Sequence, residues 1–377
     1  MVGRIVALEI RPSELGVPVQ GLQEKLRVYA RIADEGCAKD VAFVLMHPNV
    51  NYMHHYLIEP LHRCGRAVMG INSRYIGNDS MLLMERVIQD LGAGVKYLRE
   101  QGFKRIVYIG NSGGGSIGCL YQAQAEKLTI THTPDGRPID LKPDDLPPFD
   151  AIVLSCVHLG RAQTLTNRLD PSVLDERDLF GTDPDLDMYN PKNGPPYDRE
   201  WLRRYQAAQE ARHRRITQWV QARLREINAL PKERKIVDQP FLIYRTCATP
   251  QMLDATLDPN DRPPGISIWG DPRASNYSPT ILARMCTLRS YLSQWSEYSL
   301  ANGPVRLAET TVPVFNIEYS ADEGTYPKDV RAYSEAAKGR CEDYVLRGAR
   351  HYLFLQPEGS RMIAELAGVI SDWAKRH

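Results

Sequence analysis

Residues 104–126, KRIVYIGNSGGGSIGCLYQAQAE, place a glycine-rich turn where a strand would pass into a helix. The β-branched run before Gly110 is typical of a buried strand, and the small and helix-forming residues after Ser112 indicate a helix. Gly110 and Gly114 lie two residues before and two residues after Ser112, in the pattern G-x-S-x-G. Both positions need residues without side chains, because strand and helix approach closely in such a turn. The pattern predicts a sharp turn that exposes the Ser112 hydroxyl.

A serine in this turn also lies at a helix N-terminus. Free backbone N–H groups and the helix dipole favour developing negative charge there. A glycine-rich phosphate loop or a plain tight turn would use the same residue types. The strand pattern before Ser112 and the helix pattern after it favour an exposed nucleophile instead.

In the rest of the chain, short apolar runs alternate with longer amphipathic ones, which is typical of a mostly parallel sheet covered by helices. The first two strands are expected to be joined by a turn and to form an antiparallel edge. The predicted strands are 4–11, 25–32, 41–48, 66–73, 105–110, 150–156, 312–319 and 341–348. The predicted helices are 52–63, 80–101, 112–127, 327–338 and 360–375. The sequence therefore predicts an α/β fold with a mostly parallel eight-stranded sheet flanked by helices.

The rhythm of strands and helices is interrupted after the sixth predicted strand. Residues 170–198 are acidic and proline-rich without a strand pattern, and 198–227 repeat apolar residues at helical spacing. A further helical stretch is expected near 279–300. We therefore predict a largely helical cap at 159–310. The core would be built from 1–158 and 311–377.

A serine hydroxyl is a poor nucleophile at neutral pH and needs a base, which in turn needs an orienting acid. In proteins with this turn the chain order is serine, acid, histidine. Only His351 and His377 lie beyond the predicted cap, and His377 lies on a helix end, so His351 is the candidate base. The acid should follow the seventh predicted strand. Asp322 begins that loop and is favoured, with Glu318 and Glu323 as alternatives.

Taken together, these segments resemble the α/β-hydrolase family. The matching segments, in the family's order, are the turn at 110–114, the acid loop YSADEGTYP and the histidine loop GARHYL. The resemblance implies that Ser112 attacks the substrate, that His351 is general base and then acid, and that Asp322 orients His351. It also implies an oxyanion hole built from the N–H of Gly113 and an N–H in the loop after the third strand.

That loop reads LMHPNVNYM. Pro48 has no N–H to donate, so Asn49 is the predicted second oxyanion donor, with Val50 as the alternative. We interpret His47 as a structural residue at a strand end.

Three more residues are candidates for substrate binding. His158 and Arg161 follow the sixth predicted strand, on the same rim as Ser112, where a packing or capping role is the alternative. Tyr52 follows the oxyanion loop at the start of a helix. No metal site is predicted, because the neighbouring His54 and His55 would point to different faces of a helix.

The predicted reaction is hydrolysis of a small or medium carboxylic ester, apolar or aromatic, through an acyl-enzyme and without a cofactor. Asn111 before the serine supports an alternative, because some C–C bond hydrolases of this family have Gly-Asn-Ser there. Those enzymes continue with Met-Gly-Gly, whereas this chain has Gly-Gly-Gly. Amide cleavage, acyl transfer to an acceptor other than water, and a non-catalytic ligand-binding descendant complete the alternatives.

Composition limits the partners. A formal charge of +1 and a pI near 7.6 give no reason to expect nucleic acid or an anionic membrane, so a small-molecule substrate is expected. The longest apolar run, VAFVLM, is too short for a membrane helix, and the N-terminus lacks a signal-peptide pattern. Seven scattered cysteines without a C-x-x-C pair fit a reducing cytoplasm. Cap helices and edge strands leave room for a homo-oligomer.

Overall fold

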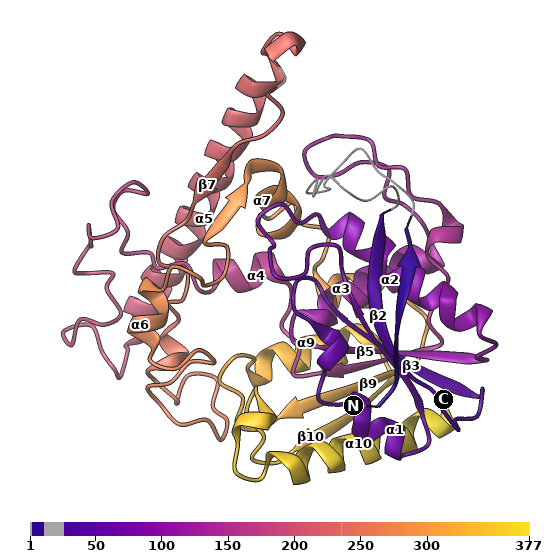
Figure 1. The fold of residues 1–377 in the computed structure, drawn as a ribbon. Helices are drawn as coiled ribbons and strands as arrows, with labels where there is room; N and C mark the ends of the chain where they lie inside the picture. The colour runs from indigo at the N-terminus through magenta and orange to yellow at the C-terminus, as the bar shows by residue number, and fades with distance from the viewer. Residues whose placement is uncertain (1, 11–25, 235) are drawn as a thin grey trace.

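The main sheet has eight strands in the order β1-β2-β4-β3-β5-β6-β9-β10 (Figure 1). The computed structural model describes residues 2–10, 26–234 and 236–377. The strands are β1 Arg4–Glu9, β2 Arg27–Ala33, β3 Val41–His47, β4 Ala67–Asn72, β5 Arg105–Asn111, β6 Ala151–Ser155, β9 Val314–Tyr319 and β10 Cys341–Leu346. The β1–β2 and β2–β4 pairs are antiparallel and the other pairs are parallel. This confirms the predicted sheet and its antiparallel edge, whereas the predicted turn between the first two strands, at 12–24, lies outside the described residues.

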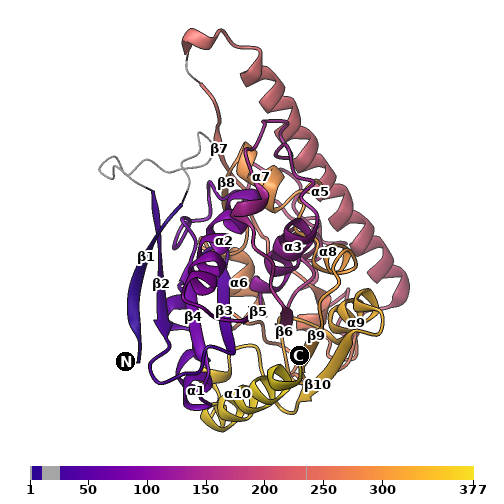
Figure 2. The same cartoon turned by 90° about the vertical axis from the view of Figure 1, so that its right-hand side faces the viewer.

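Helices cover both faces of the sheet, with α1 and α10 on one face and α2 and α3 on the other (Figure 2). The strands alternate between the two apolar cores. Val44 of β3 packs toward α2 and α3, whereas its neighbour Phe43 packs toward α1 and α10. The helices of this part of the chain are α1 Ile58–Arg63, α2 Met84–Glu100, α3 Gly114–Glu126, α9 Pro327–Ala337 and α10 Gly359–Arg376. The central strands are therefore buried on both faces, as their continuous apolar sequences predict.

Three of the predicted helices begin later than expected. The helix predicted at 80–101 is α2, which begins at Met84. The predicted helix at 52–63 consists of a short 3-10 turn, η1 Tyr52–His54, and then α1, because His55 has an extended backbone. Helix α3 begins at Gly114 and not at Ser112, because Ser112 has a positive φ of 53° that no α-helix can include.

The chain between β6 and β9 forms an insertion outside the main sheet. Its longest element is α5 Arg199–Asn228, which projects beyond the rest of the molecule (Figure 1). Asp198 caps this helix, since its side chain accepts hydrogen bonds from the amides of Glu200 and Trp201. The other elements are α4 Arg161–Thr166, η3 Lys232–Arg234, β7 Pro240–Leu242, η4 Pro250–Met252, α6 Pro272–Tyr277, β8 Met285–Thr287, α7 Leu288–Gln294 and α8 Gly303–Leu307.

The prediction of one helical stretch near 279–300 is wrong in part. Only α7 is helical there, and β8 before it pairs antiparallel with β7. This pairing joins segments far apart in sequence, so local periodicity does not report it. The insertion touches the core through Ser293 of α7, whose hydroxyl donates to Glu85 of α2 at 2.7 Å.

None of the helices in the described part of the chain is both long enough and apolar enough to cross a membrane.

Candidate active site

Ser112 occupies a strained turn between β5 and α3. Its φ of 53° lies in the left-handed region, which non-glycine residues seldom adopt. A side chain at Gly110 would approach the Cα of Gly115 to 2.7 Å, and one at Gly114 would collide with the carbonyl oxygen of Met46 in β3. Strand and helix therefore approach as closely as the G-x-S-x-G pattern predicts.

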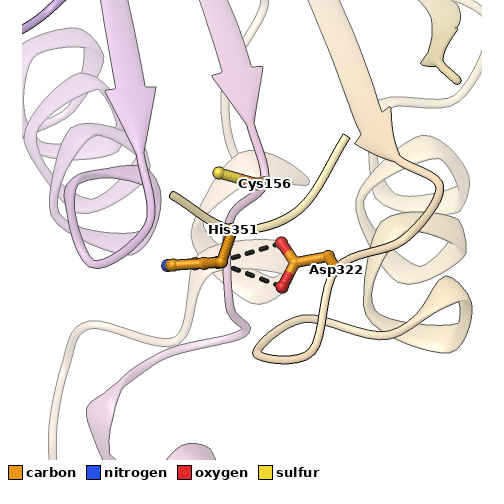
Figure 3. Close-up of side chains that lie close together, drawn as sticks. All are labelled: Cys156, Asp322 and His351. Carbon is orange, nitrogen blue, oxygen red and sulfur yellow. Dashed lines mark hydrogen bonds and ion pairs between the residues drawn. The ribbon is translucent and has the colours of Figure 1, made fainter. Parts of the chain in front are cut away.

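Three side chains from separate segments form a hydrogen-bonded chain at this turn. His351 Nε2 lies 3.0 Å from Ser112 Oγ, and His351 Nδ1 lies 2.9 Å from Asp322 Oδ2. Figure 3 shows the His351 imidazole with one ring nitrogen toward the Asp322 carboxylate. The loops after β9 and β10 bring both residues to the carboxyl edge of the sheet. The structure thus places together the three residues predicted from loop order.

Hydrogen bonds from its own loop hold the Asp322 carboxylate in place. Asp322 Oδ1 accepts from the amides of Gly324 at 2.6 Å and Thr325 at 3.0 Å, and Oδ2 accepts from the Thr325 hydroxyl at 2.7 Å. The alternative acid Glu323 pairs with Arg350 at 2.8 Å. Sequence reasoning missed Thr325, although a threonine three residues after an acid in a tight turn is a signal for this contact.

Burial and charge act in opposite directions on the two ionisable partners. Burial raises the pKa of Asp322, but the charge of His351 and the hydrogen bonds from His351, Thr325 and Gly324 outweigh it and leave that pKa below its usual value. Burial lowers the pKa of His351, but the Asp322 carboxylate outweighs it and leaves that pKa above 6.5. His351 is therefore a stronger base than a free histidine.

A cavity of about 350 Å³ opens above Ser112 and His351. Its floor comes from the core, and much of its wall comes from the insertion. Polar lining residues are His47, Asn49, Asp79, His158, Arg161, Thr164, Arg168, Thr280 and Thr325, and the larger apolar ones are Val50, Ile268, Trp269, Ile281, Leu282 and Trp295. A larger hollow of about 880 Å³ lies on the insertion and has none of the three hydrogen-bonded residues in its lining.

Two of the predicted substrate-binding residues line this cavity and one does not. His158 and Arg161 face it, and Arg161 is held by Asp79 at 2.7 Å and by Asn49 Oδ1 at 2.7 Å. Tyr52 is buried beneath the turn, where its hydroxyl donates to the backbone oxygen of Asn111 at 2.9 Å. Within the described chain Tyr52 is not part of the cavity wall, so its position is a packing position.

In the loop after β3, the backbone N–H groups of Asn49 and Val50 bond to a side chain of the same segment. The N–H of Asn49, the predicted second oxyanion donor, points to His47 Nδ1 at 3.3 Å, and the N–H of Val50 points to the same atom at 3.2 Å. In the described residues no acceptor is bonded to the N–H of Gly113, the predicted first donor.

Cys156 also lies beside the acid and the histidine (Figure 3). Ligand atoms of Cys156, Asp322 and His351 lie within 4.8 Å of one another. Burial raises the pKa of the Cys156 thiol well above its usual value, and its sulfur accepts from Asn111 Nδ2 at 3.0 Å. A neutral thiol is a poor metal ligand, and the other two groups already bind each other, so this cluster is part of the serine site.

No family model matches the sequence, and no curated protein matches it either. Solved structures do match over nearly the whole chain. The alpha/beta hydrolase GrgF from Penicillium sp. sh18 is 10% identical with a TM-score of 0.53, and the match covers 100% of this chain and 99% of that one. A thermostable carboxyl esterase from Bacillus coagulans is 13% identical with a TM-score of 0.50, covering 100% and 98%. DcsB, solved with a substrate analogue, is 12% identical with a TM-score of 0.53, covering 98% and 99%.

Proposed function

We propose that this chain, which has the α/β-hydrolase fold, is a serine hydrolase that cleaves a carboxylic ester through an acyl-enzyme. The observation that carries the proposal is the hydrogen-bonded chain from Ser112 Oγ through His351 to Asp322. The Ser112–His351 distance permits transfer of the serine proton to Nε2, and the His351–Asp322 distance lets the carboxylate orient the ring. The likeness to solved hydrolases supports the fold alone, whereas the contacts among Ser112, His351 and Asp322 support the chemistry.

In the proposed reaction, His351 Nε2 takes the proton of the Ser112 hydroxyl while Oγ attacks the ester carbonyl carbon. The carbonyl electron pair moves onto oxygen, and the N–H of Gly113 donates to this oxyanion. The intermediate then expels the alcohol, which receives its proton from His351, and leaves an acyl group on Ser112. Water gives a proton to His351 and attacks the acyl carbon, so the acid is released and the serine regains its hydrogen.

Asp322 contributes by holding the imidazole and stabilising its charged form. The carboxylate accepts from Nδ1, which leaves Nε2 free to receive the serine proton. Three hydrogen bonds from Gly324 and Thr325 keep the carboxylate ionised and fixed. The ring therefore needs no reorientation during the reaction.

The insertion 159–310 is proposed as a cap that shapes the substrate cavity. A volume of about 350 Å³ lies at the lower end of the range for small-molecule sites. Ile268, Trp269, Ile281 and Leu282 give part of the wall an apolar character. These dimensions support a small or medium ester with an apolar or aromatic portion.

Asn111 lends no structural support to C–C bond cleavage. Its side chain amide donates to the backbone oxygen of Ser155 at 3.2 Å and to Cys156 Sγ at 3.0 Å, and its oxygen accepts from Tyr52 at 3.2 Å. These internal bonds use the side chain below the turn and away from the cavity lining. Cleavage of a C–C or an amide bond is kept as a possible outcome of the experiment described next.

The test is hydrolysis of p-nitrophenyl esters of increasing acyl length by the wild type and by Ser112→Ala. We expect turnover that disappears in Ser112→Ala and persists in Ser116→Ala, a buried serine one helical turn later. Turnover that survives in Ser112→Ala would contradict the proposal. Absence of turnover at every length, together with cleavage of an amide or a C–C substrate, would replace the ester with that bond.

A further inference from the structure

Arg168, just after α4, is a buried cation without an acidic partner. Its side chain is 5% exposed and lines the cavity that holds Ser112 and His351. Among the described residues no carboxylate lies within ion-pair distance of it. Its Nη2 donates to the backbone oxygen of Gly324 at 2.8 Å and its side chain also bonds to the Cys247 thiol, whereas Nη1 has no partner in the described chain.

Most of the other buried arginines of the insertion are better satisfied. Arg161, Arg212 and Arg245 each form an ion pair at 2.9 Å or less. Arg262 has no ion pair in the described chain, but it donates to several backbone carbonyls of its own loop. Arg284 also lacks an ion pair in the described chain, but it donates to two backbone carbonyls and does not line this cavity. A guanidinium keeps its charge in proteins, and a buried charge without a partner destabilises the folded state. Arg168 is therefore the position in the cavity wall where a negative charge would stabilise the protein most.

The surroundings of Arg168 also fit a planar anion. Its guanidinium lies over the Trp269 ring, 5.5 Å from the centroid, and is tied by Gly324 to the loop that carries Asp322. Arg161, the other cavity arginine, is already compensated by Asp79. A carboxylate accepts two parallel N–H groups from a guanidinium, which adds both affinity and orientation.

We propose that Arg168 binds a carboxylate of the substrate, so that the natural ester carries a free carboxylate next to its apolar portion. The proposal rests on the proposed serine hydrolase activity. It names the substrate class of that site, an ester with one ionised carboxyl group that enters the same cavity as the scissile bond. Asp329 lines a small adjoining hollow with Arg168, and the charge of Arg168 is among the influences that oppose the rise in the Asp329 pKa on burial, but among the described residues the two groups form no ion pair.

The test compares mono-p-nitrophenyl glutarate with p-nitrophenyl pentanoate, which have equal chain lengths and differ in the carboxylate. We expect kcat/KM to be about 10- to 100-fold higher for the glutarate ester, the size of a charge-assisted hydrogen bond. Arg168→Met should abolish that preference, so that the ratio of kcat/KM for the two esters falls to about 1. Arg168→Lys should keep part of the preference, because lysine keeps the positive charge but lacks the two parallel N–H donors of the guanidinium.

A second measurement covers the case in which Arg168→Met does not fold. Free glutarate should inhibit hydrolysis of the neutral ester by the wild type, and glutaramide should not. An equal preference for both esters together with no inhibition by glutarate would overturn the carboxylate site. If the wild type cleaved neither ester, or if turnover persisted in Ser112→Ala, the proposed serine esterase activity itself would be contradicted.

His47 carries an independent inference about the oxyanion hole. Its Nδ1 accepts from the amides of Asn49 and Val50, so the lone pair of the neutral ring is on Nδ1 and the proton is on Nε2. Burial, together with the charge of Arg161, lowers the pKa of His47 well below its usual value, so the ring stays neutral. His47 thus presents one N–H donor of fixed direction.

That donor lies over Gly113. A methyl group at Gly113 would be 2.5 Å from His47 Nε2, and His47 lines the cavity above Ser112. Pro48 cannot donate, and the next two loop amides are directed at the ring. In the described chain no acceptor is bonded to Nε2, so this N–H is available to a substrate atom beside Gly113.

We infer that His47 Nε2–H is the second oxyanion donor, beside the N–H of Gly113, in place of the predicted Asn49 amide. This inference assigns a catalytic residue of the proposed hydrolase, and it gives the loop amides the separate task of fixing the tautomer. No bond is made or broken at His47, which only stabilises the charge on the substrate oxygen.

His47→Phe should lower kcat about 10²- to 10³-fold with a smaller change in KM, the effect of removing one oxyanion donor. Affinity for a trifluoromethyl ketone, which forms a tetrahedral adduct on serine, should fall in parallel. His47→Gln, which can place an N–H near the same point, should recover part of the loss. A folded His47→Phe variant with kcat within about threefold of the wild type would overturn the inference, and His47→Ala is judged by the same limit if His47→Phe does not fold.

Discussion

The core and the insertion are held together by different interactions. In the core, two apolar clusters pack against the faces of a hydrogen-bonded sheet. In the insertion the apolar clusters are smaller, and buried arginines bind acids and backbone carbonyls across the loops. These arginines are Arg212, Arg245, Arg262, Arg284 and Arg289. The core has a buried pair of this kind in Arg74 and Asp90.

In the proposed enzyme the core and the insertion have different roles. The core supplies Ser112, His351 and Asp322 from turns at the edge of a rigid sheet. The insertion supplies Arg168 and most of the apolar wall of the cavity. Changes in the core should therefore act on kcat, whereas changes in the insertion should act on KM, on specificity and on stability.

The largest effect is expected from the acid of the core. Asp322→Asn should lower kcat about 10⁴-fold, because the amide neither stabilises the imidazolium nor enforces the tautomer with Nε2 free. The measurement is steady-state hydrolysis of a p-nitrophenyl ester. Glu323→Gln is the matched control, since Glu323 pairs with Arg350 and accepts from the backbone amide of His351 but not from its ring. If Glu323→Gln were the more damaging change, the assignment of the acid would be wrong.

The next effect tests how the insertion is held. Arg245 binds Asp170 at 2.9 Å, with both side chains 1% exposed. Arg245→Met should lower the free energy of unfolding by about 3–5 kcal/mol, because it leaves the Asp170 charge buried and unpaired. Urea denaturation measures this quantity.

The control for that change is an exposed pair on the same insertion. Arg214→Met, which removes the partner of Glu210 at 3.7 Å, should change the unfolding free energy by less than about 1 kcal/mol. Equal effects of the two variants would show that buried arginine contacts are not what stabilises the insertion.

The smallest effect is expected on the pH dependence of kcat/KM. Neutral His351 is required to accept the serine proton, so kcat/KM should fall as pH decreases through the His351 pKa, which lies above 6.5. In Asp322→Asn the raising charge is absent and burial, which lowers this pKa, dominates. The midpoint of the residual activity should therefore move to lower pH. A midpoint that moves up, or does not move, would contradict the pairing of these two residues.

Sequence reasoning recovers the core because its signals are local. The strand, turn and helix around Ser112 are contiguous, and β3 to β6 are continuous apolar runs. The order of the acid and histidine loops along the chain was enough to choose Asp322 and His351. The structure places both beside Ser112, and their catalytic role stays a proposal.

The insertion depends on contacts between distant segments, and the proposed second oxyanion donor depends on the orientation of one side chain within its loop. Strand β8 forms only because β7 lies beside it, and Arg168 bonds to Gly324 across a separation of 156 residues. The side of the loop to which the Asn49 amide points depends on the ring of His47, which composition does not reveal. Propensity carries no information on such pairings.

The most direct test of the central claim is labelling of the folded protein with a fluorophosphonate, followed by intact mass measurement and peptide mapping. We expect one adduct per chain, located on Ser112, in the native protein. Urea-unfolded protein and Ser112→Ala should form no adduct. A folded protein that takes up no label, or that is labelled on another residue, would contradict the assignment of Ser112 as an activated nucleophile.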